Sequence, residues 1–268
     1  MSANIERREF PILQYRQGQI NEVTDVVAAE YDLAIQINGK EFITLLCTPR
    51  SLEDLVAGFL FSEGVIQHRD ELEGLTVDVE QKLARVTLSN KAEFFLTGDK
   101  LFAQKTITTA CGKGRSMLYV ADFETLAERP ENTFTLQAEK VLGLMAEFNR
   151  KSQLFLDTGG VHSCALSDGS GLLSFEEDIG RHNALDKILG RAMMNDIPLE
   201  NKIVLTSGRI STEIVSKVAR RGIPVIVSRS APTSAAIEQA QTLGMTLVGF
   251  ARGSKFNVYT NFSCLLRD

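Results

Sequence analysis

Ile203-Val-Leu-Thr-Ser-Gly-Arg209 begins the stretch that decides the fold of this chain, because a short apolar run ends there in small polar residues and an arginine. A segment of helical length follows the first two occurrences of the pattern. It returns in Pro224-Val-Ile-Val-Ser-Arg-Ser230 and again in residues 246–254. Strands that alternate with helices of this length indicate a parallel sheet with right-handed crossovers. We therefore predict an α/β fold.

Each of the three predicted strands ends in an arginine with serine or glycine beside it: Arg209, Arg229 and Arg252. Open α/β sheets bind ligands at the carboxyl ends of their strands. The helices that follow two of these strands would turn free N–H groups and the positive end of the helix dipole towards such a ligand. This pattern favours an anionic, phosphate-bearing ligand over a solvated basic rim. GxGxxG and Walker A motifs are absent, so ordinary dinucleotide or ATP binding is not indicated.

The segment before the first of these strands carries a second candidate cluster. We predict a helix near residues 136–150, a hairpin that turns at residues 168–171, and a long helix that includes residues 184–193. Arg181 and His182 lie where that long helix begins, although cations are disfavoured at a helix N-terminus, and this mismatch marks a candidate site. His162 follows two glycines that would let the backbone approach a ligand. Asp178 is expected to be an ordinary helix cap, and Asp186 and Lys187 to form a solvated face.

The first half of the chain alternates short strands with one helix. Asn38-Gly39 predicts a tight hairpin between residues 33–37 and 42–46. Ser51-Leu-Glu-Asp54 resembles a capping box, and we expect it to open a helix that Gly64 ends. A second hairpin is expected over residues 75–79 and 83–88. The polar segment around Pro130 predicts a domain boundary, which divides the chain into residues 1–130 and 131–268.

Cys111 lies in Thr108-Thr-Ala-Cys-Gly-Lys-Gly-Arg-Ser116, the stretch that is most informative about chemistry. Nearby cations lower the pKa of a thiol and favour the nucleophilic thiolate, and the glycines predict a mobile loop. The alternative is a small buried side chain. The other three cysteines, Cys47, Cys164 and Cys264, are dispersed and form no CxxC pair. This spacing of the cysteines indicates a protein of a reducing compartment rather than one held by a disulfide framework.

The composition and net charge exclude several classes of protein. The 268 residues carry a net charge of −5, which argues against a general binder of nucleic acid. The sequence contains no apolar run of membrane-spanning length and no N-terminal apolar signal region, so we expect a soluble cytoplasmic protein. His162-Ser-Cys164 is faintly similar to the histidine motif of zinc deaminases, but HxE and PCxxC are absent. We therefore expect neither zinc nor another bound metal.

Several motifs resemble those of the formate dehydrogenase accessory sulfurtransferases, in the same order along nearly the whole chain. The resemblance rests on Asp157-Thr-Gly-Gly-Val-His162, Glu177-Asp-Ile-Gly-Arg-His-Asn-Ala-Leu-Asp-Lys187, Thr206-Ser-Gly-Arg209, Ser228-Arg-Ser-Ala-Pro-Thr233, Gly249-Phe-Ala-Arg-Gly253 and Thr48-Pro-Arg-Ser-Leu-Glu-Asp-Leu-Val-Ala-Gly-Phe-Leu-Phe-Ser-Glu-Gly64. It implies a cytidine-deaminase-like three-layer C-terminal domain without zinc, a smaller N-terminal α/β domain, and a homodimer.

The resemblance also implies a sulfur carrier. Such a protein takes sulfur from a cysteine desulfurase as a persulfide, on the position matched by Cys111. It passes the sulfur to the molybdenum or tungsten bis(molybdopterin guanine dinucleotide) cofactor that formate dehydrogenase needs. The cofactor-binding residues predicted from the resemblance and the strand-end pattern together are His162, Arg181, His182, Ser207, Gly208, Arg209, Ser228, Arg229, Ser230, Phe250, Ala251, Arg252, Gly253, Ser254 and Lys255.

One departure from the family pattern keeps two alternatives open. Many members carry CxxC in the loop where this chain has Cys111-Gly-Lys-Gly114, so relay between two cysteines is in doubt, although one cysteine can hold a persulfide. A non-catalytic chaperone that delivers the same cofactor is the first alternative. A cysteine hydrolase that acts on a nucleotide is the second, with His162 or His182 as its base. The residues do not choose between these two histidines.

Overall fold

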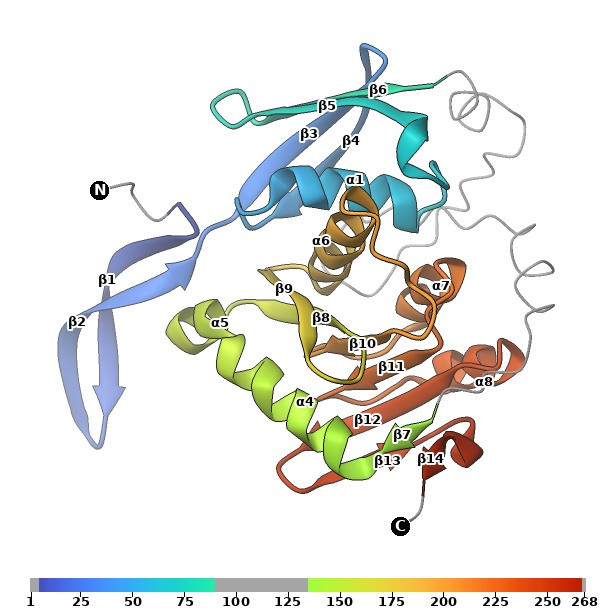
Figure 1. Cartoon of the computed structure of the whole chain (residues 1–268). Helices are drawn as coiled ribbons and strands as arrows, with labels where there is room; N and C mark the ends of the chain where they lie inside the picture. The colour runs from blue at the N-terminus through green and yellow to red at the C-terminus, as the bar shows by residue number, and fades with distance from the viewer. Residues whose placement is uncertain (1–4, 90–134, 267–268) are drawn as a thin grey trace.

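The computed structural model describes residues 5–89 and 135–266. Its largest element is a six-stranded mixed sheet with the strand order β13-β12-β11-β10-β8-β9 (Figure 1). Strands β10, β11 and β12 run parallel, as predicted, whereas β8, β9 and β13 are antiparallel to their neighbours. The strands span His162–Ser167 (β8), Leu172–Asp178 (β9), Ile203–Thr206 (β10), Val225–Ser228 (β11), Thr246–Arg252 (β12) and Lys255–Val258 (β13).

Helices cover both faces of this sheet. Successive side chains of a strand point to opposite faces. Accordingly, Val204 of β10 packs with buried residues of α6, α7 and α8, whereas Ile203 and Leu205 pack with α4. The central part of the molecule is thus a three-layer α/β/α arrangement, and its likeness to cytidine deaminases stays a prediction. The helices span Ala138–Lys151 (α4), Gln153–Thr158 (α5), Arg181–Met194 (α6), Thr212–Arg220 (α7) and Ser234–Thr242 (α8).

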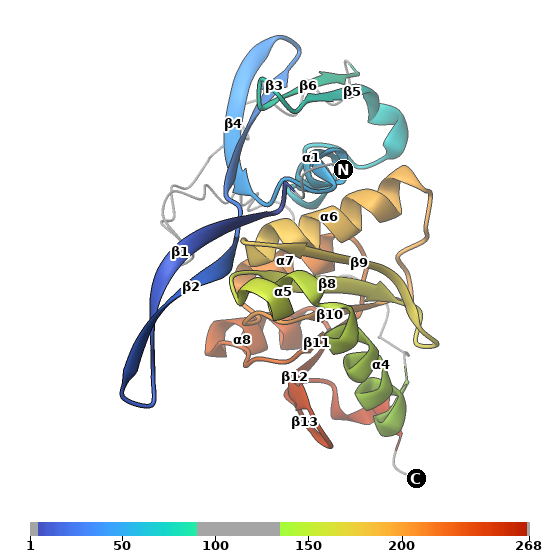
Figure 2. The same ribbon diagram turned by 90° about the vertical axis from the view of Figure 1, so that its left-hand side faces the viewer.

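A second sheet of four strands lies beyond α6, in the order β4-β3-β6-β5 (Figures 1 and 2). Both predicted hairpins are confirmed, since β3 pairs antiparallel with β4 and β5 with β6. Asn38 and Gly39 turn the first hairpin with φ angles of 48° and 78°, the positive values that a type I′ turn requires. The strands span Tyr31–Ile37 (β3), Lys40–Cys47 (β4), Leu72–Asp78 (β5) and Leu83–Leu88 (β6).

Helix α1, Leu52–Ser62, joins the two parts of the molecule. Gly64 follows its C-terminus with a φ of 80°, which confirms the predicted end of the helix. One core cluster contains buried residues of α1, of the second sheet, of α6 and of α7. The two halves therefore share a continuous core. The predicted boundary near Pro130 lies outside the described residues.

The predicted capping box at Ser51 is wrong. Ser51 has left-handed backbone angles (φ 49°, ψ 45°), and its side chain does not cap α1. Its hydroxyl instead donates a hydrogen bond to Glu176 Oε1 at 2.9 Å and accepts one from Arg191 at 3.2 Å. Glu176 is fully buried. A buried carboxylate must be paired or hydrogen-bonded, and this long-range demand overrides the local capping preference of the serine.

Helices α1 and α6 cross in backbone contact at a pair of glycines. A Cβ atom on Gly58 would lie 1.7 Å from the carbonyl oxygen of Asp186. A Cβ atom on Gly190 would lie 1.9 Å from the carbonyl oxygen of Asp54. Because backbone atoms cannot move aside as the end of a long side chain can, only glycine fits at either position. The crossing fixes α6, and with it the residues at the start of that helix.

The expected solvated face of α6 is also wrong, since Asp186 and Lys187 are 1% and 0% exposed. The ammonium of Lys187 lies 2.7 Å from Asp178 Oδ2. Asp186 accepts hydrogen bonds from Lys217 at 2.8 Å and from Ser62 at 2.6 Å. Helix α1 and its preceding loop cover this side of α6. Beneath this cover Lys187 pairs with Asp178 of β9, and Asp186 pairs with Lys217 of α7. The hydrophobic periodicity of one helix does not predict that a distant segment of the chain buries its polar face.

The strands β1 (Arg7–Arg16) and β2 (Gln19–Ala28) form an antiparallel ribbon that the sequence analysis did not predict. The ribbon extends away from the body in both views, with exposed Leu13, Tyr15 and Ile20 (Figures 1 and 2). Its base is fixed by an ion pair between Arg7 and Asp157 of α5. Shorter elements are two 3₁₀ turns, Arg69–Glu71 and Phe262–Cys264, and the pair β7 (Leu136–Gln137) and β14 (Leu265–Leu266). The described helices include none long and apolar enough to cross a membrane.

Candidate functional site

One edge of the main sheet brings several predicted residues together. The carboxyl ends of β10 and β11 lie side by side, with Thr206 opposite Ser228. Since β8 runs antiparallel to β10, its first residue, His162, lies at this same edge, opposite Asp178 at the end of β9. Helix α6 begins directly after β9, which adds Arg181 and His182. The two predicted clusters are thus one site.

Ser207 connects the ends of two strands. Its hydroxyl oxygen accepts the backbone N–H of Ser163 at 2.9 Å and lies 3.3 Å from Nδ1 of His162. A hydroxyl oxygen that accepts this bond keeps its own hydrogen, and we assign that hydrogen to Nδ1. In the neutral ring the imidazole hydrogen then stands on Nε2. We infer that His162 presents Nε2–H as a donor.

Gly208 allows the close packing of this edge. A Cβ atom there would lie 3.2 Å from Cβ and Cδ of Arg181 and 3.6 Å from Nδ1 of His162. The carbonyl of Gly208 accepts a hydrogen bond of 2.6 Å from the hydroxyl of Ser228, and that hydroxyl also accepts the N–H of Ser230. Ser228 is fully buried. Its side chain therefore braces two strand-end loops against each other.

The electrostatics of the site favour an anion. The pKa of His162 is lowered by burial first, and then by the positive charges of Arg181, Arg229 and His182. The same positive field that opposes a proton on His162 attracts a negatively charged ligand. A bound anion would in turn make the protonated ring more favourable.

Of the three strand-end arginines, Arg229 is the most firmly placed. Its guanidinium donates a hydrogen bond of 3.2 Å to Asn149 Oδ1 and lies 5.0 Å from the centre of the Phe155 ring. A cation over an aromatic face is stabilised by the ring electrons. Arg209 and Arg252 are exposed, and Arg252 lies 5.8 Å from the ring of Phe250.

Residues 250–255 include the end of β12, the two-residue turn Gly253-Ser254 and the first residue of β13. Phe250 has a φ of 51°, and its N–H donates to the carbonyl of Ser230 at 3.0 Å, which ties this turn to the loop after β11. The sheet register shifts between Gly249 and Arg252, as in a β-bulge that re-aims side chains. Ala251 is buried, whereas the following residues Arg252, Gly253, Ser254 and Lys255 are exposed.

The sequence analysis missed three contributors. Asn149 and Phe155 hold Arg229, and Glu213 lies 2.9 Å from Nε2 of His182. Glu177, quoted only within a motif, accepts the backbone N–H groups of Leu154 and Phe155 at 2.9 Å each and so caps α5. Burial raises the pKa of Glu177 against the effect of these bonds. An acidic residue in a first helical turn is ordinary, so no sequence signal singled out Glu213.

The described cysteines are poor nucleophiles. Cys47, Cys164 and Cys264 are all buried. Burial raises the pKa of Cys47 and of Cys164 to about 12, and burial raises the pKa of Cys264 as well. These thiols are protonated at neutral pH, whereas sulfur chemistry requires the thiolate. Cys111 lies outside the described residues.

Alkylation of the folded protein with iodoacetamide at pH 8 is expected to modify Cys111 and to leave Cys47 and Cys164 unmodified. At four pH units below its pKa a thiol is thiolate in about 1 of 10,000 molecules, and both side chains are also shielded from solvent. Peptide mapping before and after unfolding measures each site, and the unfolded chain should react at all four cysteines. Equal modification of Cys164 and Cys111 in the folded protein would contradict this assignment.

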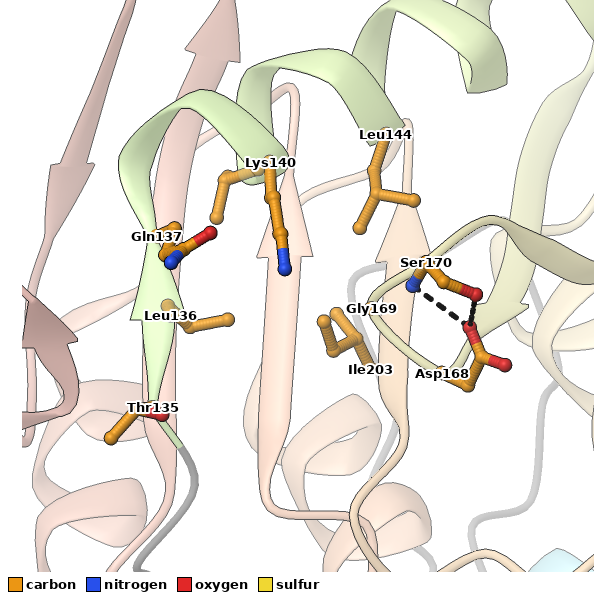
Figure 3. Close-up of a pocket in the computed structure, with 10 residues that line it drawn as sticks. Thr135, Leu136, Gln137, Lys140, Leu144, Asp168, Gly169, Ser170 and Ile203 are labelled. Atoms are coloured by element: carbon orange, nitrogen blue, oxygen red, sulfur yellow. Dashed lines mark hydrogen bonds between the residues drawn. The ribbon is translucent and has the colours of Figure 1, made fainter.

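A pocket of about 340 Å³ lies at the opposite end of β10 from the cationic edge (Figure 3). Leu136, Leu144 and Ile203 supply apolar surface, and Asp168 accepts two hydrogen bonds from Ser170 at its rim. None of the predicted site residues lines this pocket. Within residues 5–89 and 135–266, no group of three or more His, Cys, Asp or Glu residues could hold a metal ion.

The fold and the site define a class of protein: a three-layer α/β protein whose main sheet has a cationic, histidine-containing edge at the carboxyl ends of its parallel strands. The chain belongs to the FdhD/NarQ family, whose model matches residues 28–265. It is 41% identical to the "Sulfur carrier protein FdhD" of Bacillus pumilus over 97% of this chain and 98% of that one. Its identity to the protein of the same name from Bacillus subtilis is 40%, over 93% and 94% of the two chains.

A solved structure supports the same assignment. The crystal structure of a candidate formate dehydrogenase accessory protein from Desulfotalea psychrophila matches this fold with a TM-score of 0.76 and 27% sequence identity. The match covers 97% of this chain and 99% of the other. The similarity therefore extends over nearly the whole length of both chains.

Proposed function

We propose that this protein is a sulfur carrier that matures the molybdenum or tungsten bis(molybdopterin guanine dinucleotide) cofactor for formate dehydrogenase. Relatives about 40% identical are named sulfur carrier proteins. The observation that carries the cofactor part is the cationic edge around His162, where Arg181, Arg229 and His182 converge. A dinucleotide carries a negatively charged pyrophosphate, whose charge is complementary to that of this cationic edge.

The sulfur part of the proposal rests on Cys111. Three of the four cysteines are buried with raised pKa values, which leaves Cys111 as the candidate carrier. Its thiolate would attack the outer sulfur of a cysteine desulfurase persulfide. The new S–S bond forms on Cys111 as the old one breaks, and the desulfurase cysteine leaves as a thiolate. Lys113 and Arg115 would favour the thiolate that starts the exchange.

In the second step the S–S bond of the persulfide breaks, Cys111 leaves as a thiolate, and the outer sulfur bonds to the reduced cofactor, which is the substrate and supplies the electron pair that takes this sulfur to the sulfide level. Arg229 would hold a phosphate of that substrate, because Asn149 and Phe155 already fix its guanidinium. Arg209 and Arg252 would complete the phosphate contacts. A homodimer and a cytoplasmic location belong to the same proposal and rest on the resemblance and on the dispersed cysteines.

A cofactor chaperone that moves no sulfur is the second candidate. The observation that favours it is the single cysteine in Cys111-Gly-Lys-Gly114. A loop with a CxxC pair could relay sulfur between two thiols, and this loop has only one. The two candidates share the ligand site and differ in persulfide chemistry alone. Persulfide on Cys111 separates them.

Arg229→Ala is expected to weaken binding of GDP, used as a mimic of one guanine nucleotide end of the cofactor, by about 10- to 100-fold. A hydrogen bond to a charged group contributes about 1.5–3 kcal/mol. Isothermal titration calorimetry measures the affinity. Arg85→Ala removes the same charge from an exposed position on β6 and should leave binding unchanged.

The pH dependence of GDP binding provides an independent check. The pKa of free His162 is lowered, and a bound polyanion favours the protonated ring, so binding takes up a proton. GDP binding by the wild-type protein should therefore strengthen as the pH falls from 8 towards 6. GDP binding that is equal in Arg229→Ala and wild type, with no pH dependence, would contradict the ligand site.

A further inference from the structure

Glu213 and His182 form a pair at the edge of the candidate site. Nε2 of His182 lies 2.9 Å from Oε2 of Glu213, and the two side chains are 23% and 14% exposed. His182 is the second residue of α6, and Glu213 is the second residue of α7. The pair therefore joins the first turns of two helices that begin at the same edge of the sheet.

Both residues of this pair lie on helices whose positions are fixed by other contacts. Helix α6 is held by the Lys187–Asp178 ion pair and by the glycine contact between Gly58 and Gly190. Helix α7 is held against α6 by Lys217, which lies 2.8 Å from Asp186 and 2.8 Å from Glu63. The ring of His182 cannot turn without losing its contact with Glu213.

The charges around the pair are mostly positive. Arg181 of α6, Lys217 of α7 and His162 of β8 face it. The pKa of Glu213 is lowered, first by its contact with His182 and then, against the effect of burial, by the charges of His182, Arg181 and Lys217. Glu213 is therefore a carboxylate at neutral pH. Lys217 is engaged by Asp186 and Glu63, and Glu213 pairs with His182.

We propose that Glu213 is a positioning residue that fixes the ring of His182 by Nε2 and leaves Nδ1 for the ligand. This inference rests on the proposed cofactor site. Nε2 of His182 meets Glu213 at ion-pair distance rather than in an aligned hydrogen bond. In enzymes that move protons and at metal sites, a carboxylate at one ring nitrogen likewise determines what the other nitrogen can do.

The inference separates the roles of the two histidines. His162 is bonded through Nδ1 to Ser207 and stays neutral in its cationic surroundings until an anion binds. His182 contacts the carboxylate of Glu213 through Nε2. The two rings therefore offer different atoms to the ligand, Nε2 of His162 and Nδ1 of His182.

The test is GDP binding by calorimetry between pH 5.5 and 8 for wild type, Glu213→Gln, His182→Gln and the double variant. Glutamine keeps the size of glutamate and removes its charge. We expect Glu213→Gln to weaken GDP binding by about 5- to 20-fold at pH 6, in the range of a single charge-assisted contact, and less at pH 8. The double variant should bind no more weakly than His182→Gln, because Glu213 acts through that ring.

Glu238→Gln is the matched control, since it removes an exposed carboxylate from α8. It should reproduce the wild-type profile. Additive losses in the double variant, or a wild-type profile for Glu213→Gln, would overturn the positioning role while leaving the site intact. If the wild-type protein binds no GDP at any pH, the proposed cofactor site fails, and the role of Glu213 fails with it. Far-ultraviolet circular dichroism spectra and denaturation midpoints should be equal in all variants, which shows that each is folded.

Discussion

Gly58→Ala is expected to destabilise the protein by more than about 3 kcal/mol, at or above the upper end of the usual cost of overpacking a core. The added Cβ would lie 1.7 Å from the carbonyl oxygen of Asp186 and 2.7 Å from the backbone nitrogen of Gly190. Relief requires that α1 and α6 move apart along their whole crossing. That movement opens the core that the two halves of the chain share.

Chemical denaturation followed by circular dichroism measures this effect. The control is Gly143→Ala, because Gly143 lies inside α4 with nothing within 4 Å of its would-be Cβ. Alanine there should stabilise the protein by about 0.5–1 kcal/mol through its higher helix propensity. Opposite effects of the same chemical change would establish backbone contact as the cause. A Gly58→Ala protein as stable as the wild type would show that the helices do not cross as described.

Cys111→Ala is expected to reduce formate dehydrogenase activity to the background of a strain without the carrier. The three cysteines that the structure describes are all buried, and an alanine cannot hold a persulfide. The measurement is complementation of a bacterial strain that lacks its own relative of this protein. Cys111→Ser should fail equally, since a hydroxyl does not accept sulfane sulfur in thiol exchange.

Cys164→Ala is the matched control for that experiment. Cys164 is buried on β8, where its thiol contacts Thr206 at 3.4 Å. The substitution removes one small buried group and should retain most of the activity. Full activity of Cys111→Ala would contradict the carrier mechanism and leave the chaperone as the better account. Loss of activity in Cys164→Ala with normal stability would identify a second sulfur-carrying thiol.

Features that depend on a few neighbouring residues could be predicted from the sequence. Asn38-Gly39 fixes its hairpin because both residues adopt positive φ at low cost. Gly64 ends α1 for the same local reason. The parallel strands β10, β11 and β12 follow from apolar runs separated by helical segments. The strand-end arginines were found because the topology brings the carboxyl ends of parallel strands to one edge.

Features that depend on contacts across the fold could not be predicted. Ser51 matches a capping box in sequence, but the buried carboxylate of Glu176 takes its hydroxyl. Asp186 and Lys187 look like a solvated helix face because the chain segment that covers them lies far away in sequence. Glu213 is 31 residues from His182, and an acidic residue in the first turn of a helix is ordinary. Its contact with His182 follows only from the fold, which brings the first turns of α6 and α7 together.

The central claim is that Cys111 carries sulfur, and intact-mass analysis tests it most directly. Wild type and Cys111→Ala are incubated with a cysteine desulfurase and cysteine, and the intact mass of each protein is measured before and after reduction. The proposed mechanism predicts a reducible gain of one sulfur atom on the wild type and none on Cys111→Ala. An equal gain on both proteins, or no gain on a wild type that binds an active desulfurase, would contradict it.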